Sequence, residues 1–158
     1  MNVTYFPRRT VLFVSNGGIC RGAMAAGVLC HLLRTSNRGK FIQVRSVAIS
    51  GVHVGQEADP LAVAVSSARG YDIRDTRVRQ IEARDFEATS VLAADAVVLA
   101  SLRNIAPHGL GDRPRLLARY ALRGVGNIVD PYGGTTKDYE MSLEAIEASC
   151  RGLAAALL

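Results

Sequence analysis

The sequence predicts a single α/β domain over residues 1–158, built in three layers as a four-stranded, parallel, doubly wound sheet flanked by helices. Short apolar runs that suit buried strands alternate along the chain with segments of helical periodicity, which is the pattern of a parallel sheet. No repeat, linker or low-complexity segment divides the chain, and 158 residues are enough to bury one normal core.

Four segments are expected to be strands. Residues 10–14 and 41–47 are the first two, and residues 11–14 form an uninterrupted apolar run. Residues 96–100 are the expected third strand, because a continuous apolar run fits a strand that is covered on both faces. Residues 126–129, a shorter run, are the expected fourth.

Three segments are expected to be helices. The first spans about residues 21–33. The second begins at Asp59 and Pro60, an N-cap followed by proline at the first helical position, and ends near Gly70. The third spans about residues 138–157, where apolar residues recur every three or four positions. Its apolar stripe consists of Tyr139, Leu143, Ile146, Cys150, Leu153 and Leu157.

The composition restricts the function classes. The net charge of +5 comes mostly from arginine, but no basic run is interleaved with aromatic residues, so nucleic-acid binding is not indicated. No apolar run is long enough to span a membrane, and residues 1–9 lack the apolar stretch of a secretion signal. The three cysteines form no Cys-x-x-Cys pair, which indicates free thiols. We therefore expect a cytoplasmic monomer without a metal or cofactor.

Residues 15–21 read Ser-Asn-Gly-Gly-Ile-Cys-Arg and join the first predicted strand to the first predicted helix. Such a turn directs backbone N–H groups and a helix N-terminus at one point, which favours an anion. Arg21 adds a planar, two-pronged donor suited to phosphate. The loop lacks the Gly-Lys-Ser/Thr of a nucleotide P-loop and the Gly-x-Gly-x-x-Gly of a dinucleotide fold. Asp130 follows the last predicted strand and is expected to reach the same crevice.

The chain resembles the low-molecular-weight protein tyrosine phosphatases. Their loop, V-C-x-G-N-I-C-R-S-P, corresponds here to V-S-N-G-G-I-C-R-G-A at residues 14–23. The resemblance extends over roughly residues 10–157. The other matching stretches are residues 46–49, 53–55, 58–60, 79–80, 85–86, 130–134 and 138–140.

The resemblance implies phosphomonoester hydrolysis, in which a cysteine thiolate attacks phosphorus and an aspartic acid protonates the leaving phenol. Carried over, Ser15 occupies the nucleophile position and Arg21 is the phosphate clamp. Asp130 is the general acid, and Tyr132 lines the substrate crevice. The expected partner is a phosphotyrosine-containing protein, a small aryl phosphate, or phosphate or a similar oxyanion. The phosphate-binding residues are expected to be Asn16, Gly17, Gly18, Ile19, Cys20 and Arg21.

Several residues depart from the family pattern. Ser15 replaces the nucleophilic cysteine, and a serine hydroxyl is a weak nucleophile unless a base lies beside it. Gly22 replaces a serine that assists the leaving thiolate, and Gly18 replaces a loop asparagine. Thr76 stands where the family often has a histidine, and Ala23 replaces a proline. These departures predict weak or absent turnover, whether Ser15 is a natural variant or a trap substitution.

The same residues also bear on three alternative functions. A pseudophosphatase, which binds phosphotyrosine or another anion without turnover, would share the fold. An arsenate reductase needs a relay of cysteines, which the positions of Cys30 and Cys150 do not support. A relic fold would show no anion affinity in the loop. Cys20 is expected to be a packed thiol, and His53 and His108 are expected to be loop or surface residues.

Overall fold

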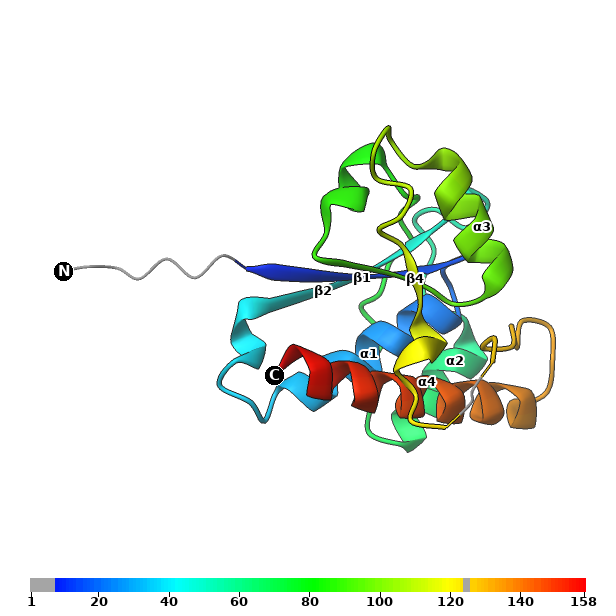
Figure 1. Ribbon diagram of the computed structural model, residues 1–158. Helices are drawn as coiled ribbons and strands as arrows, with labels where there is room; N and C mark the ends of the chain where they lie inside the picture. Colours follow the sequence, from blue (N-terminus) through cyan, green and yellow to red (C-terminus); the bar gives the residue numbers. More distant parts are fainter. Residues whose placement is uncertain (1–7, 124–125) are drawn as a thin grey trace.

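A parallel sheet forms the central layer of the fold, and helices cover both of its faces (Figure 1). The computed structural model describes residues 8–123 and 126–158. The strands are β1 (Arg9–Ser15), β2 (Ile42–Ala48), β3 (Ser90–Ala93) and β4 (Arg115–Leu116). The helices are α1 (Arg21–Leu33), α2 (Pro60–Ala68), α3 (Ala96–Ile105) and α4 (Thr136–Leu157). Short 3₁₀ helices occupy Gly39–Phe41, Ala83–Glu87 and Leu117–Tyr120.

The sheet has the strand order β2-β1-β3-β4, and every neighbouring pair is parallel. β1 is therefore an inner strand, paired with β2 through Ser15 opposite Ala48 and with β3 through Val14 opposite Ala93. The four parallel strands with helices on both faces confirm the predicted fold class. The carboxyl end of β1 lies at the middle of the sheet edge, where doubly wound folds bind their ligands.

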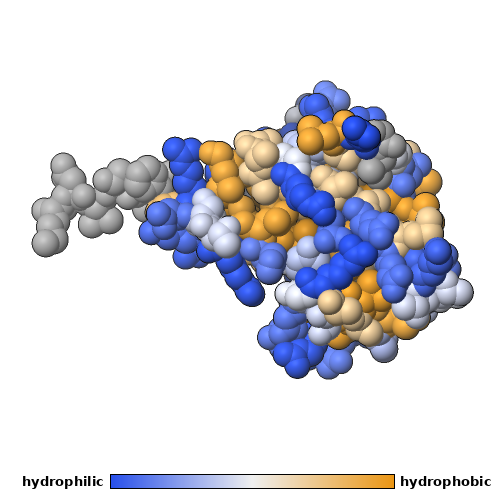
Figure 2. Space-filling model, turned by 90° about the horizontal axis from the view of Figure 1, so that it is seen from below, coloured by the Kyte–Doolittle hydropathy of each residue, from blue (hydrophilic) through white to orange (hydrophobic). Residues whose placement is uncertain are grey.

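Two hydrophobic cores lie on opposite faces of the sheet. Leu29 of α1, Leu143 of α4 and Phe13 of β1 belong to the larger core, on the side where α1, α2 and α4 are seen together (Figure 1). Leu102 of α3 and Leu12 of β1 belong to the smaller core on the other side. The successive residues of β1 thus point to opposite cores, as strand geometry requires. The outer face of the α1, α2 and α4 layer mixes polar side chains with smaller apolar patches (Figure 2).

The prediction of a strand at residues 96–100 is wrong. This apolar run lies within α3, and the third strand is β3, which precedes it. The side chain of Asp95 accepts a hydrogen bond from the N–H of Val98 and so begins the helix. Val97 is exposed, whereas a strand covered on both faces would bury it. A short apolar run is compatible with either structure, and the cap decides here.

The prediction of a strand at residues 126–129 is also wrong. The fourth strand is the two-residue β4, which pairs with β3 through Arg115 opposite Leu92. Ile128 is buried and its N–H donates to the carbonyl of Ala94 at 3.2 Å, so the segment lies beside the end of β3 without forming a ladder. The apolar residue that made this segment resemble a strand is Ile128, which is buried without belonging to the sheet.

The three predicted helices are confirmed, with small differences at their ends. α1 spans the predicted residues 21–33. α2 is capped by Asp59, whose side chain accepts from the N–H of Leu61. α4 begins two residues earlier than predicted, because Thr135 and Asp138 form a reciprocal capping box.

Gly152 fixes the packing of α4 against the Leu117–Tyr120 segment. A Cβ added at this position would overlap the backbone carbonyl oxygen of Tyr120. Alanine is favoured over glycine within a helix by about 1 kcal/mol, but backbone overlap outweighs this gain. We expect Gly152→Ala to lower the free energy of unfolding by about 2–3 kcal/mol in chemical denaturation.

Gly111→Ala is the matched control, because its new Cβ would lie at an ordinary 3.7 Å from the carbonyl oxygen of Arg103. It should change the free energy of unfolding by less than about 0.5 kcal/mol. Equal stability of the two variants would contradict the tight contact between α4 and Tyr120.

Candidate functional site

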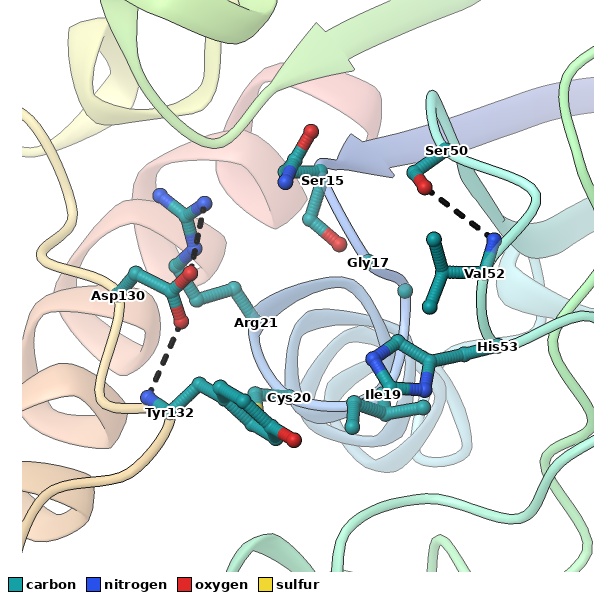
Figure 3. A pocket seen from close by; sticks show the side chains of 12 residues that line it. Ser15, Gly17, Ile19, Cys20, Arg21, Ser50, Val52, His53, Asp130 and Tyr132 are labelled. Atoms are coloured by element: carbon teal, nitrogen blue, oxygen red, sulfur yellow. Dashed lines mark hydrogen bonds and ion pairs between the residues drawn. The ribbon is translucent and has the colours of Figure 1, made fainter.

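The loop of residues 16–20 joins the carboxyl end of β1 to the N-terminus of α1 and forms the floor of a pocket of about 200 Å³ (Figure 3). Gly18 has a φ of +78°, and a Cβ there would lie 3.0 Å from the Cβ of Ala48. Glycine therefore satisfies both the backbone conformation and the close packing of this turn. The pocket is lined by Ser15, Asn16, Gly17, Gly18, Ile19, Cys20, Arg21, Ser50, Val52, His53, Asp130 and Tyr132.

The backbone N–H groups of this loop are the main feature of the site. Within the part of the chain that the structure describes, no N–H of residues 16–20 donates to another protein group. Gly18, Ile19 and Cys20 are buried nevertheless. Buried N–H groups are nearly always paired, so a row of unpaired ones in a pocket at a helix N-terminus suits an anionic ligand.

Ser15 lies at the end of β1, where it is only 2% exposed. Its Oγ accepts a hydrogen bond from the N–H of Gly22 at 3.3 Å. A Cβ on residue 22 would lie 2.9 Å from this oxygen, so the glycine leaves space beside Ser15. The hydroxyl is therefore held at the N-terminus of α1, where the helix dipole favours negative charge.

Arg21 is 3% exposed and held on two sides. Its Nη1 donates to Oδ2 of Asp95 at 2.6 Å and to the carbonyl of Ile128 at 2.8 Å. Its Nη2 lies 3.8 Å from Oδ2 of Asp130. Asp95 and Ile128 thus fix the guanidinium in one orientation. The Arg21 side chain lies at the edge of the pocket beside Asp130 (Figure 3).

Asp130 and Tyr132 form one wall of the pocket. Oδ1 of Asp130 accepts a hydrogen bond from the N–H of Tyr132 at 3.1 Å, which turns the chain sharply at Pro131. The Asp130 side chain is half-exposed, and Tyr132 is also open to solvent. The bond from Arg21 to the carbonyl of Ile128 anchors this segment to the loop.

The opposite wall comes from the segment after β2, which the sequence did not indicate as part of the site. The N–H of Ser50 donates to the carbonyl of Asn16 at 2.9 Å and so joins this segment to the loop. Oγ of Ser50 accepts from the N–H of Val52 at 3.2 Å (Figure 3). His53 is a loop residue, as predicted, but it also lines the pocket, with its ring 5.9 Å from that of Tyr132.

The His53 imidazole is engaged by a neighbour rather than by Ser15. Its Nδ1 lies 2.9 Å from Oε1 of Gln56, and no contact joins it to Ser15 among the described residues. A histidine five residues beyond the end of β2 carried no sequence signal for the pocket. His108, by contrast, is an exposed turn residue, as predicted.

Asp95 is a second site residue that the sequence did not indicate. Burial alone would raise its pKa, but the N–H of Val98 and the Arg21 guanidinium outweigh burial and lower the pKa below its usual value. The carboxylate is therefore ionised at neutral pH and neutralises part of the Arg21 charge. An aspartate two residues after β3 that caps α3 was a detectable signal, but the misplaced third strand concealed it.

Cys20 lines the pocket but does not supply a thiolate. Its Sγ lies 3.7 Å from the hydroxyl of Tyr139, and burial raises the pKa of the thiol to about 12. Cys150 is buried in the core and Cys30 is exposed on α1. All three cysteines are free thiols in the described chain.

Neither a metal site nor a membrane span is found in the described parts of the chain. No three His, Cys, Asp or Glu side chains gather there as metal ligands would. The helices in residues 8–123 and 126–158 are too short or too polar to cross a bilayer.

The buried carboxylates make the fold sensitive to acid. The Asp85 carboxylate accepts two bonds from Arg79, both at 2.8 Å. Burial would raise the pKa of Asp85, but Arg79 and the N–H of Glu82 lower it below its usual range. An unfolded aspartate has a pKa of about 3.9, so the stability contributed by Asp85 and Asp95 is complete above that value. It is lost as the pH falls through the lower pKa values of the folded protein.

We therefore expect the free energy of unfolding, measured by urea denaturation, to decline below about pH 4. Asp85→Asn should make this decline shallower, because one of the linked groups is removed. A free energy of unfolding that stays level into strong acid would contradict the paired states of these carboxylates.

The geometry defines an α/β protein in which a loop of unpaired N–H groups at a helix N-terminus is bordered by an arginine and faced by an aspartate. Residues 10–158 match the family described as low molecular weight phosphotyrosine protein phosphatase. The chain belongs to this family, which confirms the resemblance that the sequence indicated.

Individual relatives agree with this assignment. A low molecular weight protein-tyrosine-phosphatase of Streptomyces coelicolor is 35% identical over 152 residues, which cover 93% of this chain and 92% of the relative. A protein tyrosine phosphatase of Entamoeba histolytica, solved with Hepes in its active site, superposes with a TM-score of 0.89 at 24% identity, covering 94% of this chain and 96% of that chain. Vibrio vulnificus Wzb in complex with benzylphosphonate superposes with a TM-score of 0.83 at 22% identity, covering 94% and 99% of the two chains. The last two share the fold.

Proposed function

We propose that the chain binds the phosphoryl group of a phosphotyrosine-containing protein or a small aryl phosphate in the loop of residues 15–21, with very weak or absent hydrolysis. One observation carries the binding: the row of unpaired N–H groups on the buried, pocket-lining residues 18–20 beside the fixed Arg21 guanidinium. Phosphoryl oxygens accept such N–H donors, and Nη2 of Arg21 adds a charge-assisted donor at the same edge.

The walls of the pocket suit an aromatic leaving group. The rings of Tyr132 and His53 lie 5.9 Å apart and both line the pocket, so a phenyl ring attached to the bound phosphoryl group would pack against them (Figure 3). Wzb, a neighbour of the same fold, binds benzylphosphonate, in which a phosphonate is attached to a benzyl group. This ligand supports an aryl phosphate as the substrate class.

Asp130 is the residue that we assign as general acid. Its carboxyl group faces the loop beside Arg21 and is open to solvent on its other side. From this position it can give a proton to the oxygen of a leaving phenol. The role needs the protonated carboxyl, so Asp130 is not available as a base for Ser15.

Weak turnover follows from the surroundings of Ser15. In the described residues, the one hydrogen bond of its Oγ is the bond accepted from Gly22, and no imidazole or carboxylate contacts the hydroxyl. A neutral serine hydroxyl without a base attacks phosphorus poorly. The alternative function, a pseudophosphatase that only binds the phosphoryl group, differs from the proposal in having no turnover at all.

Two measurements test the proposal. Calorimetric titration with inorganic phosphate and with phosphotyrosine should show binding with a dissociation constant of about 1 mM or tighter. Hydrolysis of para-nitrophenyl phosphate at mildly acidic pH should be at or near the background rate. Clear turnover that Asp130→Ala abolishes would contradict the weak-turnover proposal, and absence of phosphate binding would contradict the site itself.

Cellular location and assembly are part of the proposal. We infer a cytoplasmic monomer, because free thiols suit a reducing compartment and Cys20 and Cys150 are packed inside the fold. Light scattering at micromolar concentration tests the monomer, and microscopy of a tagged chain tests the location.

A further inference from the structure

A second hollow lies on the far side of the Asp130–Tyr132 segment from the phosphate-binding loop. Its volume is about 320 Å³, and its wall on the helical side comes from α4. Asp130 and Tyr132 border both hollows, so the second hollow lies directly beside the first, across this segment. We call this second hollow the α4 groove; its apolar lining consists of Val129, Pro131, Met141 and Ala145.

The α4 groove gathers large apolar side chains that the fold leaves open to solvent. Val129 is 75% exposed and Met141 is 58% exposed, and Tyr132 stands at the border with the phosphate pocket. Exposed apolar residues are ordinary when scattered, but a cluster beside a binding site favours a ligand that covers it.

Ser142 adds a polar group at the base of the groove. Its side chain is 3% exposed, and its Oγ has no hydrogen-bond partner in the described structure. Ser149 on the same helix behaves differently, because its Oγ donates to the carbonyl of Ala145 at 2.9 Å. Buried hydroxyls are usually paired, so the Ser142 hydroxyl is an unsatisfied polar group just behind the groove lining.

We propose that the α4 groove binds an apolar side chain next to the phosphotyrosine of a peptide whose phosphoryl group occupies the 15–21 loop. The inference rests on the proposed function, because the phosphoryl group anchors the peptide. Asp138 also borders the groove and its pKa is lowered by bonds from Thr135, so the carboxylate disfavours an acidic side chain there. The groove thus selects apolar over acidic neighbours of the phosphotyrosine.

The test measures binding of two phosphotyrosine peptides to the intact chain by fluorescence anisotropy. One peptide has leucine on both sides of the phosphotyrosine, and the other has serine at both positions. The leucine peptide should bind about tenfold more tightly, which corresponds to burial of one aliphatic side chain. Met141→Lys should reduce this preference to about twofold or less, because the apolar wall is lost.

Val97→Lys on α3 is the matched control, since it also places a charge at an exposed apolar position but lies outside both hollows. It should leave the preference for leucine intact. Inorganic phosphate should bind equally to all three proteins, because Met141 and Val97 do not line the loop pocket.

The outcomes distinguish a failure of the α4 groove from a failure of the proposed function. Phosphate binding with equal affinity for the two peptides overturns the α4 groove as a substrate site and leaves the proposed function standing. A self-association that Met141→Lys abolishes assigns the groove to a second copy of the chain and also overturns the inference. Absence of phosphate binding overturns the proposed function, and the inference falls with it.

Discussion

Ser15→Cys is expected to give the chain a phosphatase activity at least about 1,000-fold above its own rate, since loss of a nucleophile removes most of the catalysis of such a site. Residue 15 lies at the N-terminus of α1, where the N–H of Gly22 already points at its side-chain oxygen. A thiol at this point has a lowered pKa, because the helix N-terminus and Arg21 stabilise the thiolate. The remaining parts, Arg21 and Asp130, are already in place at the pocket.

The measurement is the steady-state hydrolysis of para-nitrophenyl phosphate at mildly acidic pH by both proteins in parallel. Adding Asp130→Ala to Ser15→Cys should lower the new activity by about 10²-fold or more, as expected for loss of a general acid. Ser50→Cys is the matched control: Ser50 lines the same pocket, but its Oγ is bonded to the N–H of Val52 and lies outside the 15–21 loop. It should remain inactive.

An inactive Ser15→Cys protein that still binds phosphate would contradict this expectation. It would show that Gly18 and Gly22 have removed more of the catalytic machinery than the nucleophile. The pseudophosphatase would then be the better description of the chain.

Arg21→Met is expected to lower the affinity for inorganic phosphate by about 100-fold or more, because a charge-assisted donor fixed at the pocket is lost. The same change should lower the free energy of unfolding by about 2–4 kcal/mol. Asp95 would lose its guanidinium partner at 2.6 Å, and the buried carbonyl of Ile128 would lose its donor. Calorimetry and chemical denaturation measure the two effects.

Two further variants separate binding from folding. Arg21→Lys keeps the charge, so it should retain more stability than Arg21→Met. It cannot make the same pair of bonds, so it should bind phosphate only weakly. Arg113→Met removes a surface arginine that donates to the carbonyl of Ala88, and it should leave phosphate affinity unchanged. Normal phosphate binding by folded Arg21→Met would refute the role of Arg21 as the clamp.

The parts of the fold that the sequence predicts well are those with local signals. α2 begins where Asp59 and Pro60 place a cap, and α1 begins where the glycine loop ends. The misplaced strands lacked such signals. β3 has four residues and β4 only two, so neither shows a periodicity, whereas the apolar residues of α3 and Ile128 imitate a strand.

The candidate site likewise has a part with a local sequence signal and a part without one. The loop from Ser15 to Arg21 is continuous in sequence, and its chemistry can be predicted from the order of its residues. Two contacts arise only through the tertiary fold. Asp95 holds Arg21 although it lies 74 residues away along the chain, and His53 lines the pocket with its ring near that of Tyr132. Their contribution depends on how β1, β3 and the segment after β2 pack, which the sequence pattern does not specify.

The central claim is that the loop N–H groups hold a phosphoryl group, and an amide-resolved NMR titration with inorganic phosphate tests it most directly. We expect the largest shifts on the backbone N–H groups of residues 16–22, with Ser15→Cys giving the same pattern. Shifts centred elsewhere, or none at millimolar phosphate, would contradict phosphate binding by this loop.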